Sequence, residues 1–214
     1  MIDETLDELR PRLIAAMLPH VVFDGWSEAT LLAGARDAGI DPDIARVAFP
    51  GGAAQMIDAY TARADARLTE SLLAQDIMSM KVRERIRRAV ATRLEQASGE
   101  REAVRRALSV LAMPQNLRLA ARTLWRTADT MWRAAGDTAT DYNHYTKRAI
   151  LGAVYSATLL VWLDDASEGD ADTLAFLDRR IDGIMRFEKT KAKLTGLHLP
   201  SPTRFLGRLR YPAV

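Results

Sequence analysis

Apolar residues along this chain recur at intervals of three and four positions and rarely alternate with polar residues. Leu13, Met17 and Val21 show this spacing, which places side chains on one face of an α-helix. Strict alternation, which is typical of half-buried strands, is hard to find. The pattern predicts an all-α protein of about nine helices. Their expected ranges are 11–24, 28–37, 42–49, 53–78, 80–97, 100–112, 115–135, 141–163 and 170–193.

Residues that start or stop helices support these ranges. Pro11 suits the first turn of a helix, and Ser27 is a good N-cap for the second helix. Gly39 stands where that helix would end, in the position that favours a left-handed conformation. Pro114 precedes the predicted start of the seventh helix, and Gly136 follows its predicted end. No internal repeat or low-complexity linker interrupts the series. We therefore expect a head at 1–52, a helical body at 53–193 and a tail at 194–214.

The head has the spacing of a helix-turn-helix, with two short helices joined by a tight turn at Gly39. It resembles the head of the TetR regulators. A recognition helix needs side chains that read base edges and contact phosphates, but residues 43–49 contain one arginine and no Asn, Gln, Ser or Lys. Asp41 and Asp43 would bring carboxylates to a polyanion, which is unfavourable. We therefore expect a degenerate head that binds no nucleic acid.

The composition restricts the chemistry further. The chain is 48% apolar and 27% charged, with a net charge of +2, no cysteine and three widely separated histidines. This balance is typical of a globular protein and excludes thiol catalysis, cysteine-ligated metals and a local histidine metal site. Glycine-rich phosphate loops, HExxH and GxSxG are also absent from the sequence. We expect no enzyme activity, metal or cofactor, since a small enzyme would need a titratable cluster that the sequence does not show.

The charge pattern bears on location. The first eight residues are acidic, unlike a signal or transit peptide, and the charge-free stretch 149–163 is shorter than the ~20 residues of a spanning helix. The segment 189–214 carries six basic residues, no acidic residue and interleaved apolar ones. It is either a solvated terminus or a contact with anionic lipid, where each cation contributes about 1 kcal/mol. We expect a cytoplasmic protein.

The most informative region is 129–165. If its second part is helical, eight residues spaced by three or four positions share one face, which is polar and aromatic at its start and apolar further on. Arg148 stands where the two halves meet. A guanidinium at the mouth of an apolar channel suits an amphiphile with an anionic head, which it can bind through two hydrogen bonds. The alternative is that Arg148 pairs with a carboxylate and the apolar stripe is ordinary core. The eight residues are Asp141, His144, Tyr145, Arg148, Gly152, Tyr155, Leu159 and Trp162.

Two runs of residues carry a family resemblance that covers approximately residues 10–190. The first consists of Asp129, Met131, Trp132, Ala135, Gly136, Asp137, Thr140, Asp141, Asn143 and the segment 145–149, and the second of Asp172, Thr173 and 176–181. Together with Gly25 and Trp26 they resemble the ninth Coq protein, an accessory family of ubiquinone biosynthesis. The resemblance implies a TetR-like, dimer-forming fold that does not bind DNA. It also implies a protein that binds lipid and isoprenoid quinone and presents substrate to the di-iron demethoxyubiquinone hydroxylase.

The same resemblance assigns roles to individual residues. Arg148 matches an arginine that meets a phospholipid head group, and Tyr145 matches an aromatic residue of the partner-docking patch, with Met131, Trp132 and Asp141 nearby. His144, expected in this patch, stands where the family commonly has tryptophan. We further expect a closed apolar cavity among the helices near 115–135, 141–163 and 170–193. Its predicted lining residues are Trp125, Gly152, Tyr155, Leu159 and Trp162.

The sequence thus predicts a non-enzymatic lipid-binding accessory protein of ubiquinone biosynthesis, peripheral to the bacterial inner membrane. Its ligand would be a phospholipid or an isoprenoid quinone, and its protein partner the hydroxylase or an equivalent. The last two long helices would form a homodimer, because the apolar residues of 149–163 surround the helix on nearly all sides. The alternative is a ligand-responsive transcriptional regulator of TetR type.

Overall fold

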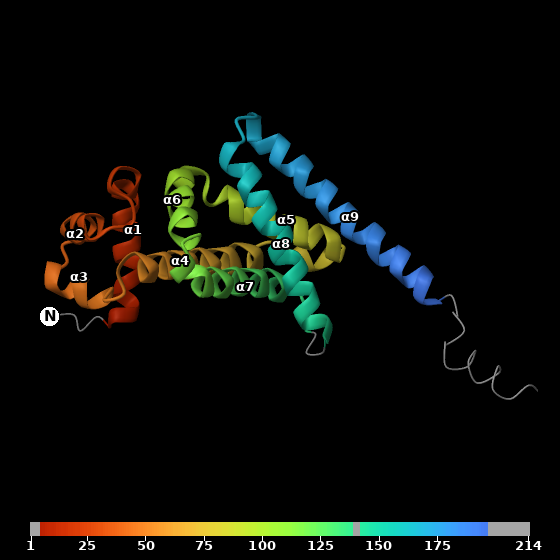
Figure 1. Ribbon diagram of the computed structural model, residues 1–214, viewed down its shortest axis with the longest axis horizontal. Coiled ribbons are helices and arrows are strands. Elements are labelled where there is room, and N and C mark those ends of the chain that lie inside the picture. The colour runs from red at the N-terminus through yellow and green to blue at the C-terminus, as the bar shows by residue number, and fades with distance from the viewer. Residues whose placement is uncertain (1–4, 139–141, 197–214) are drawn as a thin grey trace, which may run out of the picture. The chain divides into compact units, whose positions relative to one another are not determined.

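The computed structural model describes residues 5–138 and 142–196, and every regular element in them is helical (Figure 1). The all-α prediction is confirmed over this part of the chain. Asp141 and most of the predicted tail, 197–214, lie outside the described residues. The α-helices are α1 (Leu6–Asp24), α2 (Glu28–Asp37), α3 (Pro42–Ala48), α4 (Gly52–Leu73), α5 (Val82–Glu95), α6 (Arg101–Leu111), α7 (Leu117–Ala134), α8 (Tyr142–Asp164) and α9 (Ala171–Gly196).

The first helix starts five residues earlier than the sequence predicted, at Leu6. Thr5 and Glu8 form a capping box: the Thr5 backbone N–H donates to the Glu8 carboxylate at 2.9 Å, and the Glu8 N–H donates to Thr5 Oγ1 at 3.4 Å. This box satisfies backbone donors at the helix start, whereas Pro11 lies inside the helix. The prediction that Pro11 occupies the first turn was therefore wrong.

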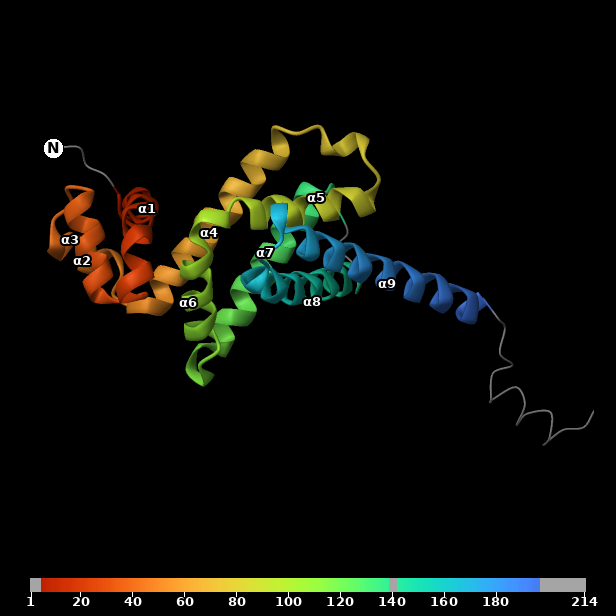
Figure 2. The same cartoon turned by 90° about the horizontal axis from the view of Figure 1, so that it is seen from above.

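The head has the expected helix-turn-helix geometry. Ser27 Oγ accepts a hydrogen bond from the Thr30 N–H at 3.2 Å and caps α2, and Gly39 follows α2 with φ of +66°. Helix α1 packs closely on α2 at Gly34, where a Cβ atom would come within 2.7 Å of Met17 Cγ. Figure 2 shows α1, α2 and α3 grouped beside the first turns of α4.

The body is built around α4, α7 and α8, with α7 packed against both of the others. Helix α4 ends at Leu73, five residues before the predicted end. Leu73 is exposed, whereas Ile77 is buried in a short 3₁₀ turn that follows. The chain leaves the helix axis and so buries Ile77, a tertiary effect that periodicity alone does not reveal.

Two compact units divide the chain, at Leu177 within α9. In the first unit, the Asp165 carboxylate accepts hydrogen bonds from the backbone N–H groups of Ser167 and Thr173 at 2.8 Å each. The hydroxyls of the same two residues also donate to it, at 2.6 and 2.5 Å. These hydrogen bonds hold the pKa of Asp165 well below its usual range and fix the start of α9.

Candidate ligand-binding cavity and aromatic surface

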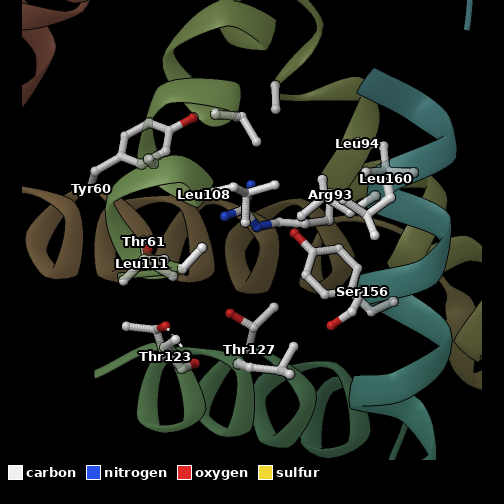
Figure 3. Close-up of a pocket in the computed structure, with 18 of the residues that line it drawn as sticks. Tyr60, Thr61, Arg93, Leu94, Leu108, Leu111, Thr123, Thr127, Ser156 and Leu160 are labelled. Atoms are coloured by element: carbon white, nitrogen blue, oxygen red, sulfur yellow. Dashed lines mark hydrogen bonds between the residues drawn. The ribbon is translucent and has the colours of Figure 1, made fainter. Parts of the chain in front are cut away.

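An apolar cavity of about 380 Å³ lies between helices α4, α5, α6, α7 and α8, all within the first unit (Figure 3). This volume falls within the ~300–1,000 Å³ typical of small-molecule sites. Aliphatic side chains supply most of the wall, so the space suits a hydrocarbon chain. They include Leu94, Val104, Leu108, Leu111, Leu124 and Leu159.

The cavity reaches the surface, because two of its lining residues are largely exposed. Leu117, in the first turn of α7, is 57% exposed, and Leu160 on α8 is 61% exposed. The expected closed cavity among 115–135, 141–163 and 170–193 is therefore corrected in two respects. The cavity is open at Leu117 and Leu160, and among the described residues its walls come from α4 to α8 and none from α9.

The predicted lining residues divide into two groups. Tyr155 and Leu159 line the cavity, but Trp125, Gly152 and Trp162 do not. Trp162 is fully buried, and its indole Nε1 donates to Asp170 Oδ2 at 3.1 Å. Gly152 is buried, and a Cβ atom there would lie at an ordinary contact distance of 3.5 Å from Leu124 Cγ on α7. The spacing of Gly152, Tyr155, Leu159 and Trp162 correctly places these four residues on one helix, α8, but not all of them line the cavity.

A buried arginine that sequence reasoning missed lies in the cavity wall. Arg93 on α5 is only 6% exposed, and Figure 3 shows its guanidinium extending among the lining side chains. Its Nε atom has no hydrogen-bond partner and lies 3.8 Å from Asp65 Oδ1. The available signal was spacing: Arg93 follows the buried residues Ile86 and Val90 by seven and three positions, on the apolar face of α5.

Other polar groups near the cavity already have partners or stay uncharged. The Asp65 carboxylate accepts from Thr127 Oγ1 at 2.9 Å and from Arg126 Nε at 3.2 Å. Burial nevertheless raises the pKa of Asp65 above its ordinary value. The Tyr60 hydroxyl donates to Glu100 at 2.8 Å. Burial also raises the pKa of the Tyr60 and Tyr155 phenols, which are therefore neutral donors at neutral pH.

Arg148 lies outside the cavity lining and is 2% exposed. Its Nε donates to Asp129 Oδ1 at 2.6 Å, and its Nη1 donates to Asp137 Oδ2 at 3.0 Å and to the His144 carbonyl at 3.1 Å. Burial raises the pKa of Asp137, but hydrogen bonds from Lys147 and Arg148 outweigh this effect and lower it overall. The structure thus shows Arg148 paired with carboxylates, which is the alternative that the sequence left open. A head-group contact through Arg148 stays a prediction, and it would require the guanidinium to leave these partners.

Three aromatic rings form a surface cluster at the start of α8, defined by Trp125, His144 and Tyr145. The Trp125 and Tyr145 ring centres are 6.0 Å apart, and those of His144 and Tyr145 are 5.1 Å apart. Tyr145 is 61% exposed. Of the other residues predicted to dock a partner, Trp132 is half-buried, with its indole donating to the Lys147 carbonyl at 3.0 Å. Met131 is fully buried, so its side chain cannot contact a partner on this surface.

The head presents an unfavourable surface to a polyanion. Arg46, the one arginine of α3, donates to Glu28 and to Asp43 at 2.8 Å each. Ile44 and Val47 on the same helix are exposed apolar residues. The helix that would enter a DNA groove therefore carries an arginine already paired with carboxylates.

Two searches of the described residues bear on function. No group of three or more histidine, aspartate and glutamate side chains in the described ranges is arranged to hold a metal ion. No helix in the part of the chain that the structure covers combines the length and apolar character needed to span a membrane.

The fold is that of the TetR class. A solved structure, the TetR transcriptional regulator from Nitrosomonas europaea, superimposes with a TM-score of 0.65 over 81% of this chain and 96% of its own. The two sequences are 20% identical, so this likeness shows the fold alone. The TetR-like fold predicted from the sequence is thereby confirmed.

Sequence comparison finds similarity to one protein family. The COQ9 family model matches residues 117–188, which span α7, α8 and part of α9. The chain is 33% identical over 202 residues to the mitochondrial ubiquinone biosynthesis protein COQ9 of Rattus norvegicus, and 32% identical to that of Homo sapiens. Each match includes 90% of this chain but only 64% and 63% of the respective relative. The predicted resemblance is confirmed as a similarity to the COQ9 proteins, and the chain spans somewhat less than two thirds of the length of these relatives.

Proposed function

We propose that this protein is a non-enzymatic accessory protein of ubiquinone biosynthesis that binds a phospholipid or an isoprenoid quinone and presents quinone intermediates to a hydroxylase. The observation that carries the proposal is the apolar cavity of about 380 Å³ that helices α4, α5, α6, α7 and α8 enclose. This cavity is open at Leu117 and Leu160. Its relatives are named as ubiquinone biosynthesis proteins, which supports the choice of ligand.

The cavity can supply the required affinity through burial of hydrocarbon. Each buried methylene contributes about 0.8 kcal/mol, so eight to ten carbons contribute roughly 6–8 kcal/mol before the costs of ordering the ligand. A short-tailed ubiquinone should therefore bind saturably, with one molecule per chain. Titration calorimetry with such a quinone measures this directly, and the absence of binding up to its solubility limit would contradict the cavity assignment.

The aromatic surface cluster is the proposed docking site for the hydroxylase. Exposed aromatic side chains ringed by polar groups are typical anchors of protein interfaces. His144 belongs to this cluster, and its ring is proposed to take part in docking. Trp132 and Asp141, of which Asp141 lies outside the described residues, are proposed to contribute to docking.

Tyr145→Ala is expected to weaken docking strongly without unfolding the protein. Loss of an interface anchor costs about 2 kcal/mol or more, which weakens binding roughly thirtyfold. Because Tyr145 is 61% exposed, the free energy of unfolding should change by less than about 0.5 kcal/mol. A pull-down of demethoxyubiquinone hydroxylase and a urea titration measure the two effects. Phe23→Ala, at a 79% exposed residue on α1, is the matched control. Lost stability with retained pull-down would make Tyr145 a core residue.

A homodimer is proposed through the last two long helices. The exposed face of α8 carries small and apolar residues, including Ala149, Ala153 and Leu160. Such a face favours contact with a second copy or with lipid over contact with water. Sedimentation velocity at micromolar concentration should give the mass of a dimer, and a monomer under these conditions would contradict the proposal.

The proposed location is the cytoplasmic surface of a bacterial inner membrane. A peripheral position would let the open end of the cavity exchange an apolar ligand with the bilayer. The basic tail predicted to contact anionic lipid lies outside the described residues. Flotation with vesicles containing phosphatidylglycerol tests this location.

A further inference from the structure

We infer that Arg93 binds the polar end of the ligand, so that the cavity selects an amphiphile with an anionic, carboxylate-like head and holds this head innermost. The inference rests on the proposed function, because it assumes that the cavity binds an apolar chain. It adds the class of head group and the orientation: the head lies at Arg93, and the chain runs toward Leu117 and Leu160 at the surface. This orientation places the head in the cavity and away from Arg148.

The first support is the position of the Arg93 guanidinium. The side chain is more than nine-tenths buried, yet it lies in the wall of the cavity and points among apolar residues (Figure 3). A guanidinium carries five N–H donors and remains charged in proteins. Arg93 forms an ion pair with Asp65 at 3.8 Å, but its buried Nε has no hydrogen-bond partner. A buried N–H donor without an acceptor is unfavourable unless a ligand supplies one.

The second support is the charge balance around the cavity wall. Two carboxylates, Asp65 and Glu100, act electrostatically on Arg93. Asp65 lies 3.8 Å away and accepts hydrogen bonds from Thr127 and Arg126 instead, and Glu100 pairs with Arg63 and Arg67. Arg126 also pairs with Asp58, which in turn pairs with Arg122. In this connected group five arginines therefore share three carboxylates. The excess cation favours an anion over a neutral head.

The third support is the set of donors beside Arg93. Tyr155 and Ser156 line the same cavity from α8, and both hydroxyls can donate to a ligand oxygen. Burial keeps the Tyr155 phenol protonated, because it raises the pKa of this group. A guanidinium flanked by hydroxyl donors matches the paired oxygens of a carboxylate, which accept two parallel hydrogen bonds from the guanidinium fork.

The test compares a fluorescent fatty acid with its neutral ester. The full-length protein is titrated with cis-parinaric acid and with methyl parinarate, which share the same hydrocarbon chain. We expect the acid to bind at least tenfold more tightly than the ester. In Arg93→Met the affinity for the acid should fall to the affinity for the ester. The affinity for the ester should stay unchanged. Arg88→Met, at an exposed arginine on the same helix, should behave like the unmodified protein.

The outcomes separate this inference from the proposed function. If the unmodified protein binds acid and ester equally, or if Arg93→Met keeps the preference for the acid, the inference is overturned and the apolar cavity stands. If neither ligand binds, the proposed function fails together with the inference. Thermal unfolding without ligand adds a second readout: Arg93→Met should melt at the same or a higher temperature. If Arg93→Met does not fold, Arg93→Lys keeps the charge without the fork and should reduce the preference for the acid.

Discussion

Replacement of Arg148 by alanine is expected to lower the free energy of unfolding by about 3–5 kcal/mol, the usual cost of removing one partner of a buried ion pair. The Arg148 side chain is 2% exposed. Its Nε lies 2.6 Å from Asp129 Oδ1, and its Nη1 lies 3.0 Å from Asp137 Oδ2. Without it, Asp129 loses its buried cation. Asp137 keeps Lys147 at 2.6 Å, so a value near the lower end of this range is expected. Urea unfolding followed by circular dichroism measures the change.

Arg133→Ala is the matched control, because Arg133 pairs with the other oxygen of Asp129 at 2.7 Å but is 70% exposed. Its loss should cost less than about 1 kcal/mol, as for other surface pairs. Equal losses for the two variants would contradict a stabilising role of the buried pair. An Arg148→Ala protein with full stability and reduced lipid content would instead support the head-group contact that the sequence predicts.

Ala107→Phe is expected to reduce bound ligand at least tenfold by filling the cavity. Ala107 lies on α6, is buried, and lines the cavity, so the ring would occupy part of the 380 Å³ available to a ligand. The free energy of unfolding should stay within about 1 kcal/mol or rise, because the ring adds buried apolar area to open space. The amount of lipid extracted per chain and a urea titration give the two quantities.

Ser109→Phe adds the same ring to an exposed position on α6 and should leave bound ligand unchanged. The assignment of the cavity is contradicted if Ala107→Phe folds normally and retains as much ligand as Ser109→Phe. A ligand elsewhere on the protein would produce that result, since a substitution inside the cavity would not affect it.

Local signals in the sequence are sufficient to locate most helices of this protein. Ser27, Gly39 and Asp41 act at the ends of α2 and α3 through short-range hydrogen bonds and backbone conformation, which depend on neighbouring residues. The start of α1 was missed because Pro11 was preferred to the capping box of Thr5 and Glu8. These errors are of a few residues and leave the order of helices unchanged.

The site was harder to predict, because it depends on contacts between helices far apart in the chain. The stripe on α8 was correctly placed on one face, but only Tyr155 and Leu159 of its apolar members line the cavity. Trp162 does not line the cavity, and its indole donates a hydrogen bond to Asp170. Arg93 belongs to a strongly basic segment; its spacing from Ile86 and Val90 is a weak signal, and packing of α5 against α4, α7 and α8 is what buries it.

The most direct measurement of the central claim is the lipid content of the natively purified protein. The full-length chain is purified without detergent and extracted with organic solvent, and the extract is analysed by mass spectrometry and quantified per chain. Binding in the cavity predicts close to one amphiphile with a long apolar chain per protein, depleted at least tenfold in Ala107→Phe. A protein that carries no such molecule, and takes none up when incubated with vesicles that contain ubiquinone, would contradict the claim.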